Sequence, residues 1–145
     1  MSIIKGLADA VALDLKTFNF ERDLTVESVL YVDLDRSNLD GLSIYVLPGE
    51  VDIEGYSRNQ NTWDISITVV VTFSSSDEEE IDDTAPEMLT LVEALMQSFV
   101  KKSLQVDAQR YTVESVKLPV PYNSERLKDE MLFESIFSLG FSTNQ

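Results

Sequence analysis

One stretch of this sequence, residues 61–73, constrains the fold more than any other part of the chain. It reads NTWDISITVVVTF, and apolar side chains occupy every second position from Trp63 to Phe73. Because successive side chains of a strand point to opposite faces, this spacing gives one continuous apolar face. Most of these residues are β-branched or aromatic, the types that suit a half-buried pleated surface. We therefore expect the central strand of a sheet here, with helices packed on its apolar face.

Two segments have the three- and four-residue apolar spacing of amphipathic helices. The first runs from residue 2 to about residue 17, and Ser2 can cap its first turn. The second runs from about 84 to 104. There Thr84 opens the sequence TAPE, a capping box with Pro86 in the first turn.

Further segments that alternate or are rich in β-branched residues predict strands. Pro48 removes a backbone donor from one of them, which therefore lies at a sheet edge or bulges at Pro48. A turn over residues 55–60 joins that strand to the central one, so 42–73 forms a long hairpin. The connection over 120–130 has room for a short helical turn. The predicted extended segments are 18–22, 29–34, 42–51, 111–119 and 132–142.

The segment between the hairpin and the second helix is strongly acidic. It reads SSSDEEEIDD, with six carboxylates and three serines in ten residues. A block of like charge repels itself, so we expect a mobile, solvated loop over 74–83. The element order is then α-β-β-β-α-β-β in a single domain over residues 1–145. This order predicts an α+β fold, with one mostly antiparallel sheet of about four to five strands and two helices packed on one face.

Net charge is the unusual quantity in the composition. The chain has 11 Lys and Arg against 26 Asp and Glu, which gives a formal net charge of −15. Such a surface repels phosphate backbones, which argues against nucleic-acid binding. The ordinary consequence of this charge is solubility. A sharper one is that DNA can pass close to the protein without binding.

Cysteine and histidine are both absent. Their absence excludes disulfides, thiolate nucleophiles, the usual Cys/His zinc sites and histidine proton relays. The five glycines match neither a dinucleotide fingerprint nor a phosphate-binding loop, and no spacing singles out a catalytic pair of carboxylates. We therefore expect no catalytic residues, no cofactor and no metal, in a protein that is not an enzyme.

Neither a secretory signal nor a membrane span is expected. The N-terminal segment lacks a basic region followed by a long apolar core, and no apolar run approaches the ~20 residues that cross a bilayer.

Residues 33–38, DLDRSN, begin like a calcium-binding loop but do not complete one. Asn38 stands where the sharp-turn glycine belongs, and Ile44 stands where the bidentate glutamate belongs. A turn with side-chain hydrogen bonds is the better interpretation. The acidic run 77–83 can attract divalent cations, although consecutive carboxylates in a loop are not preorganised to hold one.

Several stretches taken together resemble a known family. An opening helix, IKGLADAVALDL, is followed by NFERDLTVESVLYVDLDRSNLDGLSIYVLPGEV and then by SRNQNTWDISITVVVTF. An acidic gap, a long helix and a closing LFESIFSLGFS strand complete the pattern. This order resembles the small tail-completion proteins of tailed bacteriophages, the tail terminator or neck family, over nearly the whole chain.

The resemblance implies a structural virion protein that is assembled in the host cytoplasm. Such proteins form a ring, commonly a homohexamer, at the head-proximal end of the tail tube. The ring ends tube polymerisation and joins the tail to the head connector. The implied partners are further copies of the chain, the tail tube protein and the head–tail connector or neck proteins, while DNA passes without specific binding. The candidate contact residues lie in the hairpin turn and the acidic segment: Tyr56, Ser57, Arg58, Asn59, Gln60, Asp77, Glu78, Glu79 and Glu80.

Two other classes of function remain open from the sequence. A monomeric acidic interaction module, such as an adaptor or an inhibitor that mimics DNA charge, would bind a basic partner in a salt-sensitive way. An enzyme that uses paired carboxylates is the other class. A ring protein self-associates, a mimic competes with DNA, and an enzyme turns over a substrate.

Overall fold

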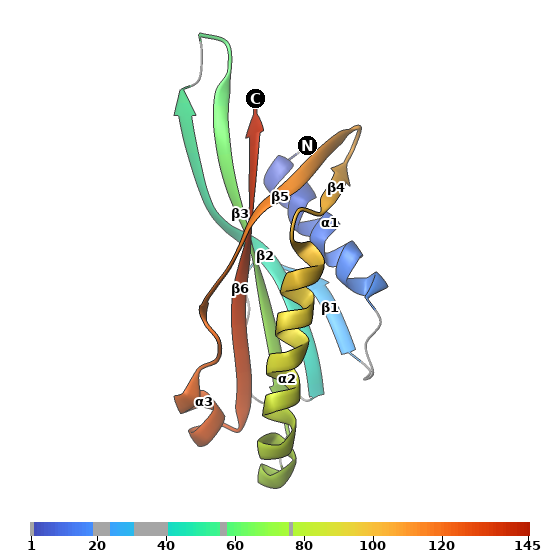
Figure 1. Cartoon of the computed structure of the whole chain (residues 1–145), viewed down its shortest axis with the longest axis vertical. Coiled ribbons are helices and arrows are strands. Elements are labelled where there is room, and N and C mark those ends of the chain that lie inside the picture. Colours follow the sequence, from blue (N-terminus) through green and yellow to red (C-terminus); the bar gives the residue numbers. More distant parts are fainter. Residues whose placement is uncertain (1, 19–23, 31–40, 56–57, 76) are drawn as a thin grey trace.

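The computed structural model is an α+β fold with one mixed sheet, and it describes residues 2–18, 24–30, 41–55, 58–75 and 77–145 (Figure 1). Within these residues the sheet has six strands in the order β1-β2-β3-β6-β5-β4. All neighbouring strands are antiparallel except β1 and β2, which are parallel. The elements are α1 (Ile3–Thr17), β1 (Leu24–Ser28), β2 (Gly41–Gly55), β3 (Asn61–Ser74), α2 (Glu78–Phe99), β4 (Ser103–Val106), β5 (Gln109–Val120), α3 (Ser124–Asp129) and β6 (Leu132–Asn144).

The prediction of a central strand is confirmed, because β3 lies between β2 and β6 along its whole length. Paired residues of adjacent strands share a face, and Val71 lies opposite both Ile44 and Ser135. The alternating apolar positions of β3 therefore join those of β2 and β6 in one buried layer. The members of this layer in β3 and β6 are Ile65, Ile67, Val69, Val71, Phe73, Phe133, Phe137, Leu139 and Phe141.

Helices α1 and α2 cover this layer, which we call the core face. Helix α1 contacts β1, β2 and β3, and α2 contacts β3, β5 and β6. Their apolar stripes, which include Leu7, Val11, Val92 and Phe99, belong to the same core cluster as the strand residues. The opposite side of the sheet, which we call the second face, carries mostly polar residues along the upper half of the molecule.

The sheet curves around α1. This helix contacts β4 as well as β1 and β2, although these strands lie at opposite ends of the sheet order. Strand β5 carries two irregularities, between Val113 and Ser115 and between Lys117 and Val120, and bulges of this kind increase the bend and twist of a strand. The approach of α1 to β4 is close, since a Cβ added at Gly6 would lie 2.6 Å from Cγ1 of Val106.

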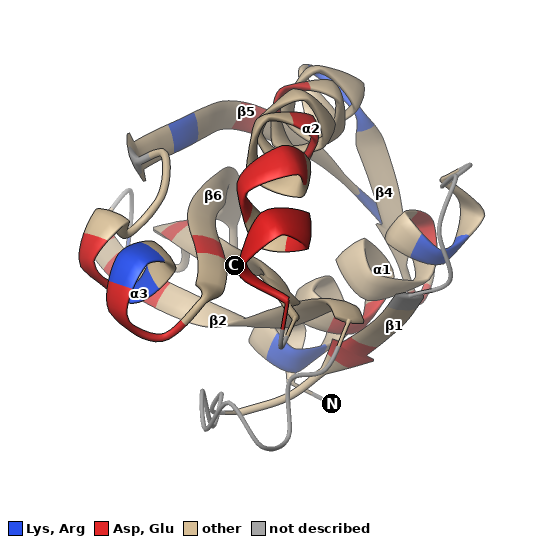
Figure 2. Cartoon of the chain, turned by 90° about the horizontal axis from the view of Figure 1, so that it is seen from below, with Lys and Arg blue, Asp and Glu red and all other residues tan. Residues whose placement is uncertain are grey.

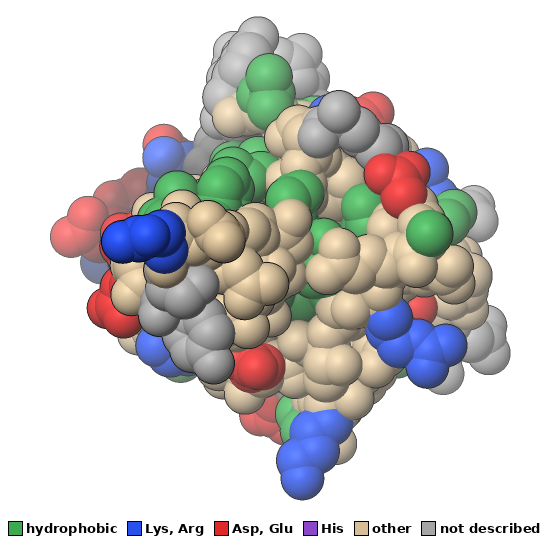
Figure 3. Space-filling view, turned by 90° about the horizontal axis from the view of Figure 1, so that it is seen from above, with side chains coloured by type: hydrophobic (Ala, Val, Ile, Leu, Met, Phe, Trp, Pro, Cys, Tyr) green, Lys and Arg blue, Asp and Glu red, His purple; other side chains and the backbone are tan. Residues whose placement is uncertain are grey.

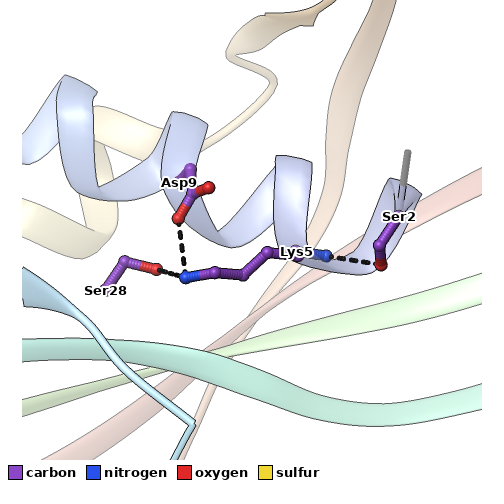
Figure 4. Close-up of polar contacts among 4 residues, drawn as sticks. All are labelled: Ser2, Lys5, Asp9 and Ser28. Carbon is purple, nitrogen blue, oxygen red and sulfur yellow. Dashed lines mark hydrogen bonds and ion pairs between the residues drawn. The ribbon is translucent and has the colours of Figure 1, made fainter.

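A small polar cluster links α1 to the outer strand β1 (Figure 4). The Ser2 hydroxyl accepts a hydrogen bond from the Lys5 backbone N–H at 3.2 Å, which caps the helix. The Lys5 ammonium donates to both Asp9 Oδ1 and Ser28 Oγ at 3.0 Å. The Ser28 hydroxyl and then the Lys5 ammonium hold the pKa of Asp9 below its ordinary value.

Residues 78–83 of the acidic segment are helical, so the prediction of a loop there was wrong, although the described carboxylates are exposed as expected. Strand β3 continues to Ser74, and Asp77 is the N-cap of α2, accepting a hydrogen bond from the Glu79 N–H at 3.0 Å. The acids of the first turn complement the positive end of the helix dipole, which offsets their mutual repulsion. Ile81, only 2% exposed, anchors this turn in the core.

Helix α2 also ends earlier than predicted, at Phe99 rather than at residue 104. Lys101 adopts a positive φ of 58°, which turns the chain directly into β4. Pro86 lies inside the helix rather than in its first turn.

The remaining differences concern short elements. The strand predicted over 29–34 does not include Val29 and Leu30, which follow β1, and residues 31–34 lie outside the described residues. Of the extended segment 18–22, only Phe18 is described, where it caps α1. Strand β4 was missed because its first two residues were assigned to the preceding helix. The short helical turn is confirmed as α3. The sheet is therefore larger than the predicted four to five strands, and a third helix joins the two expected.

Candidate functional site

The upper part of the β2–β3 hairpin is the most distinctive surface of the molecule. We call residues 47–55 and 58–66 the arm. The pairing of β1 with β2 ends at Ser28 and Val46, and one further hydrogen bond joins the Val29 N–H to the Val46 carbonyl at 2.8 Å. Beyond Val46, β3 is the only described strand that pairs with β2. Figure 1 shows the tip of the arm standing clear of the end of β6. Within the described part of the chain, the arm therefore carries a backbone edge without a strand partner, a template for pairing with another chain.

A bulge decides which side chains each face of the arm presents. Pro48 lies opposite Ile67 and Val51 lies opposite Ile65, so β2 contains one residue more than β3 over this interval. The predicted bulge at Pro48 is thereby confirmed. The extra residue reverses the alternation along β2, because Val46 faces the core below it and Val51 faces the core above it.

One side of the arm is apolar. Val51, Ile53 and Trp63 extend the core face beyond the helices, and Ile53 is 53% exposed. The indole Nε1 of Trp63 is buried without a hydrogen-bond partner among the described residues. Seen from the end that carries the arm tip and the C-terminus, hydrophobic side chains gather near the middle of the surface, with charged groups mostly toward its rim (Figure 3).

The other side of the arm is acidic. It carries Glu50, Asp52, Glu54 and Asp64, and Asp52 lies directly opposite Asp64 in the ladder. Like charges placed opposite one another destabilise a strand pair. Glu50, Asp52 and Asp64 line an open groove of about 410 Å³ on the second face, which β5 completes on its far side. No three carboxylates of the described chain come close enough to hold a metal ion. The incomplete calcium motif at 33–38 lies outside the described residues.

The structure separates the predicted contact residues into two groups. Arg58, Asn59 and Gln60 are exposed at the tip of the arm, whereas Tyr56 and Ser57 lie outside the described residues. Asp77, Glu78, Glu79 and Glu80 are exposed at the start of α2, at the opposite end of the long axis (Figure 1). Figure 2, seen from that end, shows the acidic first turns of α2 foremost. The seven described residues do not form one site; they belong to the two ends of the molecule.

Sequence reasoning missed the acidic side of the arm. Its signal is present in LPGEVDIEG, where Glu50, Asp52 and Glu54 alternate with Val51 and Ile53. Alternation of charge with apolar residues is typical of a strand with two different faces.

Glu134 is the main buried carboxylate of the second face. It is 8% exposed, its Oε2 accepts no hydrogen bond within the described chain, and the Arg126 Nε lies 3.7 Å away. Burial raises the pKa of Glu134, and the Arg126 charge offsets part of that effect. The folded protein therefore holds this proton more tightly than the unfolded chain does. Consequently, Glu134 lowers stability as the pH rises from the ordinary glutamate pKa through the raised one.

We expect Glu134→Gln to raise the free energy of unfolding at pH 7 by about 0.5–1 kcal/mol, because it removes a poorly solvated charge. The gain should shrink toward pH 4, where the wild-type carboxyl is itself protonated. Urea unfolding of both proteins at the two pH values measures the difference. A loss of stability at pH 7 would instead show that the Arg126 ion pair outweighs the cost of burial.

Comparisons with known proteins do not assign the chain to a family. No protein-family model matches it, and no curated protein matches its sequence significantly. Among the helices of the described residues, none is long and apolar enough to cross a membrane.

Proposed function

We propose that this chain is a structural protein that forms a ring at the head-proximal end of a bacteriophage tail. It ends the polymerisation of the tail tube and joins the tail to the head connector. Its partners are further copies of itself, in a closed ring of about six, together with the tube and connector proteins. DNA passes through the ring without specific binding, and the protein performs no catalysis.

The observation that carries this proposal is the arm, which has an exposed apolar side and a backbone edge that no strand of the described residues pairs with. An edge strand of this kind favours pairing with another chain, and closed rings arise when one surface contacts a different surface of the next copy. The two ends of the long axis differ chemically, because one carries the arm with its apolar side and the other carries the acidic start of α2. This difference fits a ring that contacts one partner at each end.

The acidic groove supports a second candidate, a monomeric module that binds a basic partner. Glu50, Asp52, Asp64 and Glu114 line it together with a single cation, Lys117. This arrangement suits a basic peptide or a DNA-binding surface, which would dock through complementary charge.

Electron microscopy of the purified protein distinguishes the two candidates. The ring proposal predicts end-on views with rotational symmetry and a central opening. The alternative predicts single small particles, together with salt-sensitive competition against DNA for a basic partner. Particles without rotational symmetry at all protein concentrations would count against the ring.

A further inference from the structure

We propose that the arm of one copy pairs with the exposed edge of β5 in a second copy, so that neighbouring subunits form one continuous β-sheet. This inference rests on the proposed ring and identifies the contact between its subunits.

Strand β5 has a second edge that is unpartnered among the residues that the structure describes. Strand β4 pairs with residues 109–112 of β5, and one further hydrogen bond joins the Val113 N–H to the Lys102 carbonyl at 2.8 Å. Beyond them β6 is the only described strand that pairs with β5. Glu114, Ser115, Lys117 and Pro119 are all exposed there. This edge is of similar length to the unpaired part of β2, so both partners of a strand pair are present on the same molecule.

The strand directions suit this pairing. Strands β2 and β6 both run antiparallel to β3, and β5 runs antiparallel to β6. Strand β2 is therefore antiparallel to β5. Copies related by rotation about an axis to which the strands are tilted keep these directions. The tilt is needed because within one copy Val51 is level with Val113, above the unpaired part of β5. The arm of one copy would then lie antiparallel to β5 of the next, as the sheet already prefers.

The apolar sides of the two edges correspond. Val116 lies opposite Leu139, so it points to the core face, and both Val116 and Leu118 are half-buried beside the core. Pairing with the arm would place Val51 and Ile53 beside these residues. The exposed side chain of Ile53 would then be covered by a surface of its own kind.

On the second face, the charges of the two edges are opposite in sign at Lys117 of β5 and at the carboxylates of the arm. Lys117 lies opposite Ser138 on that face, where it would approach the acidic side of the arm. Lys117 is the one basic residue on this part of β5, where it stands three positions from Glu114. A two-fold contact between two arms would instead bring Asp52 and Glu50 of both copies together. Like-charge repulsion therefore disfavours that alternative.

The absence of cysteine makes the contact testable by crosslinking. Asp52→Cys and Lys117→Cys replace exposed residues of the two edges. A chain that carries both should form a ladder of disulfide-linked species up to the full ring under oxidising conditions. Asp52→Cys combined with Lys128→Cys, an exposed position on α3, is the matched control and should give no ladder.

A charge reversal provides an independent measurement. Lys117→Glu should weaken self-association at least tenfold, and Lys128→Glu, with the same change in net charge, should leave it unaltered. Dimers formed by Asp52→Cys alone would show an arm-to-arm contact and overturn the inference. A wild-type ring with neither a ladder nor an effect of Lys117→Glu would overturn it and leave the ring standing. A wild-type protein that stays monomeric at every concentration would overturn the ring and the contact together.

Discussion

Phe137→Ala should remove about 3–5 kcal/mol from the free energy of unfolding. Phe137 is 0% exposed on β6, opposite Val69 of the central strand, and it lies under the helices in the middle of the core face. Truncation leaves a cavity that rigid neighbours on the sheet cannot collapse to fill. Guanidinium or urea unfolding at a fixed protein concentration measures the loss, since self-association adds to apparent stability.

Leu13→Ala is the matched control for this prediction. Leu13 lies on α1 but is 67% exposed, so its truncation should change stability by less than about 0.5 kcal/mol. A cost for Phe137→Ala no larger than that of Leu13→Ala would mean that the core face is not packed as described.

Gly49→Ala should lower the free energy of unfolding by about 2–3 kcal/mol, which is the upper part of the range for overpacking. A Cβ at this position would lie 2.9 Å from both the Ser66 carbonyl oxygen and Thr68 Oγ1, closer than such atoms normally approach. Ser66 is fixed by the ladder with β6 and cannot withdraw. The strain falls on the bulge that sets the two faces of the arm, so self-association should weaken as well.

Gly55→Ala should raise the free energy of unfolding, whereas Gly49→Ala should lower it. A Cβ there has no neighbour within 4 Å among the described residues. The substitution also restricts the unfolded chain, which stabilises proteins by about 0.4–1 kcal/mol at compatible sites. Parallel urea titrations of the two variants test the pair. Equal effects would show that the bulge does not constrain Gly49.

The long periodic elements of the fold were predictable because burial on one face fixes their pattern. The central strand, the closing strand and the first helix all follow from alternating or three- and four-residue apolar spacing. The acidic segment was mispredicted because the mutual repulsion of its carboxylates was given more weight than Ile81, the single apolar anchor within it. Strand β4 was missed because four residues show too little periodicity to separate a strand from a helix end.

The candidate surface was only partly predictable for a different reason. The turn at the tip of the arm follows from its sequence, and so does the bulge at Pro48. The unpaired edges do not, because the extent of an edge depends on where β1 and β4 stop pairing with their neighbours. Both of these strands contact α1, a tertiary arrangement that no local sequence pattern indicates.

The acidic composition determines how assembly of a ring should depend on salt. Each copy carries a formal charge of −15, so subunits repel one another at low ionic strength. Salt screens this repulsion, with a screening length of about 10 Å at 0.1 M, while the buried apolar contact is maintained. Assembly should therefore strengthen as salt is raised, the reverse of the behaviour expected for an acidic module bound to a basic partner.

Native mass spectrometry of the purified protein across salt concentrations tests the central claim most directly. The proposed ring predicts a discrete closed species with about six times the 16.3 kDa mass of one chain. The fraction of protein in this species should increase with the salt concentration in which the sample is incubated before measurement. A single species of 16.3 kDa at every salt and protein concentration would contradict self-assembly and favour the monomeric acidic module.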